Sequence, residues 1–200
     1  MSKHSKLVQG IGTNSGKYPA ISNSRALKEY EAWSSMLKRC ANYYWVKFPT
    51  YEGITCSENF KSYSFFYEWC QTQVGFGMVD NNGKSWQLDK DLLSGSNKFY
   101  SEDTCVFLPQ RINSLINRRN NARGDCAIGV RFLNNRFHAS CCIGSSVKTY
   151  LGSFTSEQEA FQAYKTYKEI LIKQVANEYK EQLDPRAYQA LMNYQVEITD

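Results

Sequence analysis

The densest group of side chains that could do chemistry is a set of arginines in the middle of the chain. Between Arg111 and Arg136 the only acidic residue is Asp125. Guanidinium groups bind phosphate oxygens and guanine edges through paired hydrogen bonds, so this set predicts a nucleic-acid partner. A solvated charged surface is the alternative interpretation. The arginines are Arg111, Arg118, Arg119, Arg123, Arg131 and Arg136.

A predicted sheet positions part of this charge. Apolar and polar residues alternate with period two from Val130 to Leu151, which indicates three strands with turns at 134–135 and 144–146. Thr155 and Gln158 form a capping-box signal for a helix that would cover one face of the sheet. The other face would then present cations and an aromatic ring, a pattern typical of nucleic-acid binding. Its residues are Arg131, Arg136, His138, Lys148 and Tyr150.

The remaining chain predicts a second module, which makes the whole an α+β protein. Apolar residues at helical spacing indicate helices near 25–40 and 60–70, and short strands are expected near 86–89 and 104–108. Pro109 fits the first turn of a further helix. The expected parts are a flexible polar arm at 1–24, a helical module with a ββα element at 25–119, a basic linker at 120–126, a sheet-and-helix domain at 127–183 and an acidic tail at 184–200.

Composition excludes several classes of protein. A hydrophobic fraction of 42% with 22% charged residues is typical of a globular chain rather than a disordered one. No stretch approaches about 18 apolar residues, so an integral membrane protein is not expected. The first 24 residues lack the apolar core of a secretion signal, so the seven cysteines are expected to be intracellular thiols. Without a Cys-x-x-Cys pair, a zinc site is not expected.

Four motifs in the C-terminal part resemble the APETALA2-type DNA-binding domain. The resemblance covers roughly Ala127 to Tyr179 and keeps the spacing of the family. The motifs are Gly129-Val130-Arg131, Arg136-Phe137-His138-Ala139, the segment from Lys148 to Phe154, and the segment from Glu159 to Tyr164.

The resemblance implies that the three-stranded sheet enters the major groove of double-stranded DNA. Arg131, Lys148 and Tyr150 occupy positions at which the family contacts DNA. Ile128 and Cys142 replace arginines of the plant members, so their base specificity does not carry over. Arg123 in the linker, and Arg118 and Arg119 directly before it, are expected to bind phosphates.

The N-terminal part resembles bacteriophage relatives of HNH (His-Me finger) homing endonucleases, which often carry a C-terminal APETALA2-type domain. The resemblance covers roughly Glu31 to Arg119 and implies a phage-encoded protein in the cytoplasm of a bacterial host. Its motifs are the segments 33–40, 49–53, 88–91 and 100–105, together with Asn113.

Carried over by position, this resemblance implies a degenerate catalytic site. Asp89 and Asn113 stand at metal-ligand positions and would hold Mg²⁺ through oxygen atoms. Thr104 stands at the orienting position. Lys90 replaces the histidine general base, and a lysine is a poor base near neutrality. The alternative at this site is that Asp89 and Lys90 merely cap a turn.

Three functions therefore stay open. The first is a double-stranded-DNA-binding protein, derived from an HNH homing endonuclease, that no longer cleaves. The second is an active Mg²⁺-dependent DNA endonuclease that uses an unconventional base. The third is a protein-interaction adaptor that uses the aromatic-rich N-terminal half. No membrane partner is expected.

Overall fold

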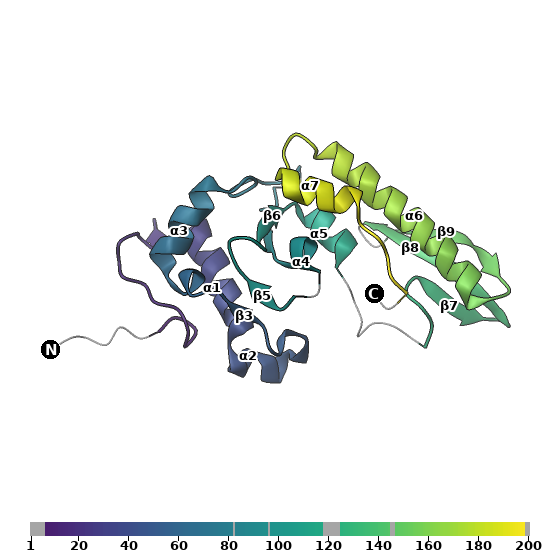
Figure 1. Cartoon of the computed structure of the whole chain (residues 1–200), viewed down its shortest axis with the longest axis horizontal. Helices are drawn as coiled ribbons and strands as arrows, with labels where there is room; N and C mark the ends of the chain where they lie inside the picture. The colour runs from purple at the N-terminus through teal and green to yellow at the C-terminus, as the bar shows by residue number, and fades with distance from the viewer. Residues whose placement is uncertain (1–6, 82, 96, 118–124, 145–146, 199–200) are drawn as a thin grey trace. The chain divides into compact units, whose positions relative to one another are not determined.

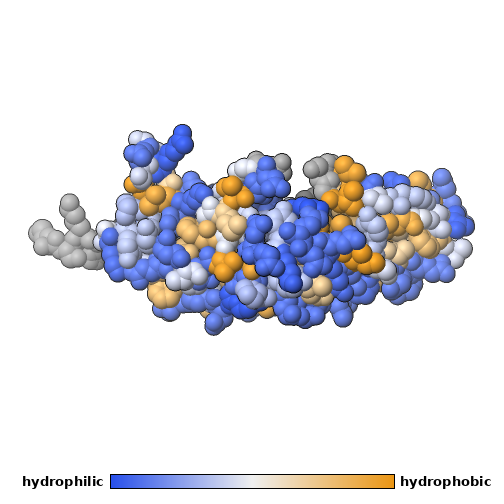
Figure 2. All heavy atoms as spheres, turned by 90° about the horizontal axis from the view of Figure 1, so that it is seen from above, coloured by the Kyte–Doolittle hydropathy of each residue, from blue (hydrophilic) through white to orange (hydrophobic). Residues whose placement is uncertain are grey.

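The computed structural model divides the chain into two compact units, Met1–Pro109 and Gln110–Asp200 (Figure 1). Each unit combines helices with strands, so the predicted α+β class is confirmed. No helix among the described residues is long and apolar enough to cross a bilayer. On the face seen in Figure 2, hydrophilic side chains prevail and apolar ones gather in separate patches. The structure describes residues 7–81, 83–95, 97–117, 125–144 and 147–198.

The first unit is built on two helices, α1 (Lys28–Cys40) and α3 (Tyr63–Thr72), which pack against each other. Trp33 and Leu37 lie one turn apart on α1 and are both fully buried, because these positions share one face of a helix. Ser62 caps α3 by accepting a hydrogen bond from a backbone N–H of its first turn. Other fully buried core residues are Met36, Phe60, Tyr63 and Phe66.

Short strands and helices complete the described part of the first unit. β1 (Ile21–Ser22) pairs antiparallel with β2 (Arg25–Ala26), β3 (Thr55–Cys56) pairs parallel with β5 (Phe99–Tyr100), and β4 (Gln87–Asp89) pairs antiparallel with β6 (Val106–Leu108). The short helical elements are α2 (Asn42–Lys47), η1 (Pro49–Tyr51), η2 (Asn59–Lys61) and α4 (Asp91–Ser94). β4, β6 and α5 (Gln110–Ile116) follow the expected strand–strand–helix order, although α5 belongs to the second unit.

The N-terminal segment differs from the predicted flexible arm. From Leu7 onward it packs on the first unit. The N–H of Thr13 donates to the carbonyl of Lys61 over 2.8 Å, and the ring of Tyr18 stacks on that of Tyr67 at 4.1 Å between centroids. Gly12 permits this close approach, because a Cβ at this position would lie under 3.0 Å from the Leu37 side chain. Irregular backbone pairing of this kind leaves no periodicity in the sequence.

The second unit contains the predicted three-stranded sheet and its covering helix. β7 (Val130–Leu133), β8 (Arg136–Gly144) and β9 (Val147–Phe154) pair antiparallel in that order. α6 (Glu157–Glu178) lies along one face of the sheet (Figure 1). Asn134 and Asn135 join β7 to β8 with φ of 50° and 58°, as a type I′ turn requires.

The capping box of α6 is displaced by one residue from its predicted place. The hydroxyl of Ser156 accepts from the N–H of Glu159, and the Glu159 carboxylate accepts from the N–H of Ser156. Thr155, the predicted cap, instead donates its hydroxyl to Glu159. Two adjacent hydroxyl residues made both registers compatible with the sequence, so the predicted pairing of Thr155 with Gln158 was wrong.

The predicted acidic tail holds ordered structure. α7 (Pro185–Met192) begins after Asp184, whose carboxylate accepts from a backbone N–H of the first turn. Beyond α7, Val196 is only 3% exposed and packs in the core with Cys141, Phe161 and Tyr164. Residues 184–198 are therefore part of the second unit rather than an appendage.

Candidate nucleic-acid interface

The register of the sheet places the predicted DNA-contacting side chains on one face. Val130 pairs with Ala139, and both face α6. The next pair, Arg131 with His138, therefore points to the opposite face. On β9 the partners of β8 on that same face are Lys148, Tyr150 and Ser153. The structure thus brings together Arg131, Arg136, His138, Lys148 and Tyr150, which we call the open face.

The open face is cationic and has no acidic side chain of its own. The sequence from Cys126 to Ser156 contains no Asp or Glu. Arg131 and Lys148 are exposed, and neither makes a hydrogen bond or ion pair with another described residue. These two cations are available to bind an anion.

Arg136 differs from these two cations because the sheet holds its guanidinium in place. Its Nε donates to the hydroxyl of Ser153 over 2.8 Å, and one terminal nitrogen donates to the Ser153 carbonyl over 3.1 Å. Ser153 was not predicted as a site residue. Strict alternation along β9 would place Ser153 on the covered face with Leu151, and the register shift between Ala139 and Ser140 brings it to the open face, so no sequence signal could have found it.

His138 and Tyr150 form a hydrogen-bonded pair at the centre of the open face. Nδ1 of His138 lies 3.1 Å from the Tyr150 hydroxyl, and Nε2 lies 3.2 Å from the carbonyl oxygen of Leu133. The two rings are tilted by 35° with centroids 6.1 Å apart. Tyr150 is 62% exposed, so its ring stands on the surface although its hydroxyl is held.

The arginines in and directly before the predicted linker, Arg118, Arg119 and Arg123, lie outside the described residues. Arg111, at the start of the arginine-rich stretch, belongs to α5 and forms a two-pronged ion pair with Glu178 of α6. Because this pair neutralises its charge, Arg111 contributes less to an anion-binding surface than the unpaired Arg131 does.

The predicted metal ligand Asp89 caps a helix. Its Oδ2 accepts hydrogen bonds from the N–H groups of Asp91 over 3.0 Å and Leu92 over 2.8 Å, in the first turn of α4. The side chain is buried, and this burial raises the pKa of the carboxyl above its ordinary value. For Asp89 the structure therefore bears out the turn-capping interpretation.

Lys90, at the general-base position, is buried and fully engaged. It is 5% exposed. Its ammonium donates to the Asp91 carboxylate and to the Asn97 carbonyl, and lies 5.6 Å from the ring centre of Tyr100. An ammonium has three donors and no lone pair, so in this ion pair Lys90 accepts no proton from water.

Of the other two residues of the predicted site, Thr104 stabilises a turn and Asn113 belongs to a different unit from Asp89. The hydroxyl of Thr104 donates to the Phe99 carbonyl and accepts from the N–H of Ser101, both over 2.9 Å, and thus stabilises the turn between β5 and β6. Asn113 lies half-buried on α5 in the second unit, whereas Asp89 lies in the first. The pairing of Asp89 with Asn113 in one site stays a prediction.

The residues around Asp89 do not fit a Mg²⁺ site. One carboxylate oxygen of Asp89 is used by two backbone N–H groups, and the neighbouring carboxylate of Asp91 is paired with Lys90. Magnesium needs several accessible oxygen ligands in near-octahedral geometry. The described residues contain no group of three or more Asp, Glu, His or Cys that could hold a metal ion.

No family model matches this chain, and no match is found among the curated proteins or the solved structures. Both resemblances therefore rest on the sequence motifs alone.

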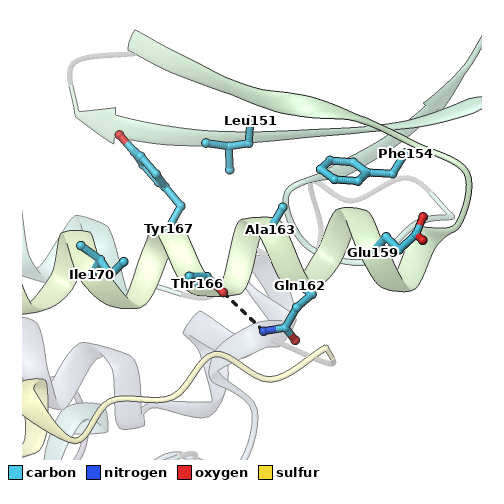
Figure 3. A pocket seen from close by; sticks show the side chains of 8 residues that line it. All are labelled: Leu151, Phe154, Glu159, Gln162, Ala163, Thr166, Tyr167 and Ile170. Carbon is cyan, nitrogen blue, oxygen red and sulfur yellow. Dashed lines mark hydrogen bonds between the residues drawn. The ribbon is translucent and has the colours of Figure 1, made fainter.

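A second surface feature lies on the other side of the sheet. Between β9 and α6 a shallow, mostly apolar groove of about 670 Å³ opens to the surface (Figure 3). Leu151 and Phe154 reach into it from β9, and Ala163 and Tyr167 reach from α6. The groove lies on the helix-covered side of the sheet, so it is distinct from the open face.

Proposed function

We propose that the protein binds double-stranded DNA through the open face of the second unit, with the sheet in the major groove. The observation that carries the proposal is the acid-free face itself, on which two unpaired cations flank a held, exposed tyrosine. Such a face attracts phosphate without repulsion from a nearby carboxylate.

The architecture of the sheet supports this mode of binding. The major groove is about 12 Å wide and admits a two-stranded ribbon, and several DNA-binding proteins read bases from strands. α6 covers the opposite face, so a single face of the sheet presents its side chains outward. Free Arg131 and Lys148 would bind phosphate or base edges, and the held Arg136 would present a guanidinium of fixed direction.

In this proposal the first unit does not cleave DNA. Asp89 serves as a cap and Lys90 as the cation of a buried ion pair, so neither is free for hydrolysis. We expect the full chain to leave supercoiled plasmid intact with Mg²⁺ or Mn²⁺. Nicking that is abolished by Asp89→Ala, but not by a substitution on the open face, would favour the endonuclease instead.

The binding itself is tested by titrating a labelled duplex with the full chain at several salt concentrations. Each phosphate that a cation neutralises contributes about −0.9 to the slope of log K against log salt, so two phosphate contacts, by Arg136 and Lys148, predict a slope of about −1.8 or steeper. Absence of binding at about 50 mM salt, or affinity that does not change with salt, would reject the proposal and favour the adaptor.

A further inference from the structure

The hydrogen bonds around His138 determine what the Tyr150 hydroxyl can offer to a ligand. Both ring nitrogens of His138 have oxygen neighbours, the hydroxyl of Tyr150 on one side and the carbonyl of Leu133 on the other. A carbonyl oxygen only accepts hydrogen bonds, so Nε2 must carry the hydrogen. In a neutral imidazole Nδ1 is then an acceptor, and Tyr150 must donate its hydroxyl proton to it.

This arrangement leaves the Tyr150 oxygen as an outward acceptor. Its hydrogen is directed into the sheet face, and the remaining lone pair of the oxygen points away from His138. In the major groove the base groups that donate hydrogen bonds are the N4 amino group of cytosine and the N6 amino group of adenine. The acceptors of guanine and thymine offer no hydrogen to such an oxygen.

We propose that His138 is a positioning residue that makes Tyr150 selective for a base-edge amino group, cytosine N4 or adenine N6. The inference rests on the proposed function, because it assumes that the open face meets the major groove. It assigns a role to His138 that composition and charge do not reveal, since its effect is exerted on Tyr150 rather than on DNA.

The groups around His138 define the conditions of the test. Arg131 is its cross-strand partner on β7, Arg136 is two residues away on β8, and Tyr150 and Ser153 face it from β9. An imidazolium would donate to Tyr150 and turn its hydroxyl hydrogen outward, so the inference concerns a neutral ring. Because histidines in general change charge between about pH 5 and 8, the measurements are made at about pH 8.5, and the nitrogen-15 shifts of the ring report its protonation.

The experiment is selection of preferred sites by the full chain from a random duplex library, followed by sequencing. We expect one base pair that is preferred by roughly tenfold, the discrimination typical of a base-edge hydrogen bond. This preference should be lost when the amino group of that pair is removed, with adenine replaced by purine or cytosine by pyrimidin-2-one. Tyr150→Phe and His138→Phe should both abolish the preference at that same position. His138→Asn, whose side-chain oxygen can replace Nδ1 as acceptor, should retain it.

A matched control and a direct spectroscopic measurement accompany the selection. Tyr188→Phe removes a hydroxyl that is bonded to Asn177 on the other side of the unit, and it should alter no preference. Nitrogen-15 shifts of the His138 ring in the free protein should report hydrogen on Nε2. Hydrogen on Nδ1 alone would overturn the inference, whatever the variants do.

The outcomes separate the inference from the proposed function. If the chain binds no duplex, both fail. If it binds but the base pair sensitive to Tyr150→Phe keeps its affinity after its amino group is removed, or if His138→Phe leaves the preference intact, only the role of His138 is wrong. If Tyr150→Phe changes no position in the site, the inference is likewise contradicted while DNA binding stands.

Discussion

Gly129 lies directly against the ring of Tyr164. A Cβ at Gly129 would be under 3.0 Å from three ring carbons of Tyr164, and the backbone there has φ of +76°. Gly129 starts the Gly129-Val130-Arg131 motif, and Tyr164 ends the segment 159–164. The contact fixes α6 against the start of β7, and so holds Arg131 on the open face.

Gly129→Ala should therefore destabilise the second unit. The methyl group meets the Tyr164 ring in a conformation that already disfavours a side chain, so we expect a loss of roughly 2–4 kcal/mol in the free energy of unfolding. Urea denaturation measures it. Gly77→Ala is the control, because Gly77 has φ of +74° but nothing within 4 Å, and it should cost only about 1–2 kcal/mol. Equal losses in the two variants would show that the Tyr164 contact is unimportant.

The C-terminal segment should stabilise the second unit through Val196. Its N–H donates to the carboxylate of Glu169 over 2.9 Å, its carbonyl accepts from the ammonium of Lys165 over 2.6 Å, and its side chain is buried. Val196→Ala should lower the free energy of unfolding by about 2 kcal/mol. Ile198→Ala, at a side chain 44% exposed, should change it little. Thermal unfolding measures both variants, and a melting temperature of Val196→Ala equal to that of the wild type would contradict this role.

Asp89 combines a buried carboxylate charge with a hydrogen-bond acceptor for two backbone N–H groups, and Asp89→Asn separates these two contributions to stability. Burial raises the pKa of Asp89, so protonation favours the folded state, and the stability that this contributes is lost as the pH rises through the folded pKa. Asparagine keeps an acceptor for the two N–H groups and removes the buried charge. Asp89→Asn should thus be at least as stable as the wild type at pH 7, with a difference that shrinks toward low pH.

Asp89→Ala is the matched comparison for this prediction. It removes the acceptor as well as the charge, and should cost about 1 kcal/mol, the usual worth of a helix cap. Chemical denaturation from about pH 7 to about pH 4 measures all three proteins. If asparagine destabilises the protein as much as alanine does at neutral pH, the carboxylate charge is itself stabilising and the account of Asp89 is wrong.

Residues on the open face and the arginines directly before the predicted linker should affect DNA binding differently. Arg131→Ala should weaken a preferred site more than random duplex, by roughly 1–3 kcal/mol, because a base contact carries sequence information. Arg118→Ala and Arg119→Ala should weaken all duplexes alike, because phosphate contacts carry none. Affinities for a selected and a scrambled duplex decide the matter. If Arg131→Ala and the Arg118 and Arg119 variants lose affinity for the two duplexes in the same proportion, the proposed difference between base-contacting and phosphate-contacting arginines is wrong.

The sheet of the second unit was predictable because its signals are local. Strand alternation, the Asn134-Asn135 turn and the long helix each leave a periodic or dipeptide pattern, and one covered face then fixes which residues face outward. The held pairs could not be predicted. Whether His138 meets Tyr150, or Arg136 meets Ser153, depends on cross-strand register and on the bulge near Ala139.

The first unit was harder to predict, because its contacts join residues that are distant in sequence. The parallel pairing of β3 with β5 and the packing of Gly12 against Leu37 leave no short-range pattern. Motif positions alone also left Asp89 with two interpretations, and only its two backbone hydrogen bonds distinguish a cap from a ligand. The sequence did offer one unused signal, Asp184-Pro185, a standard start for a helix such as α7.

The claim that the open face binds DNA is tested most directly by reversing its charge. Arg131→Glu with Lys148→Glu should reduce the affinity of the full chain for duplex DNA by at least about tenfold at about 100 mM salt, measured by fluorescence anisotropy. Lys84→Glu with Lys180→Glu makes the same change in net charge at exposed lysines that are not part of the sheet, and should reduce it far less. Equal losses in the two double variants would mean that only net charge matters, and would contradict the account.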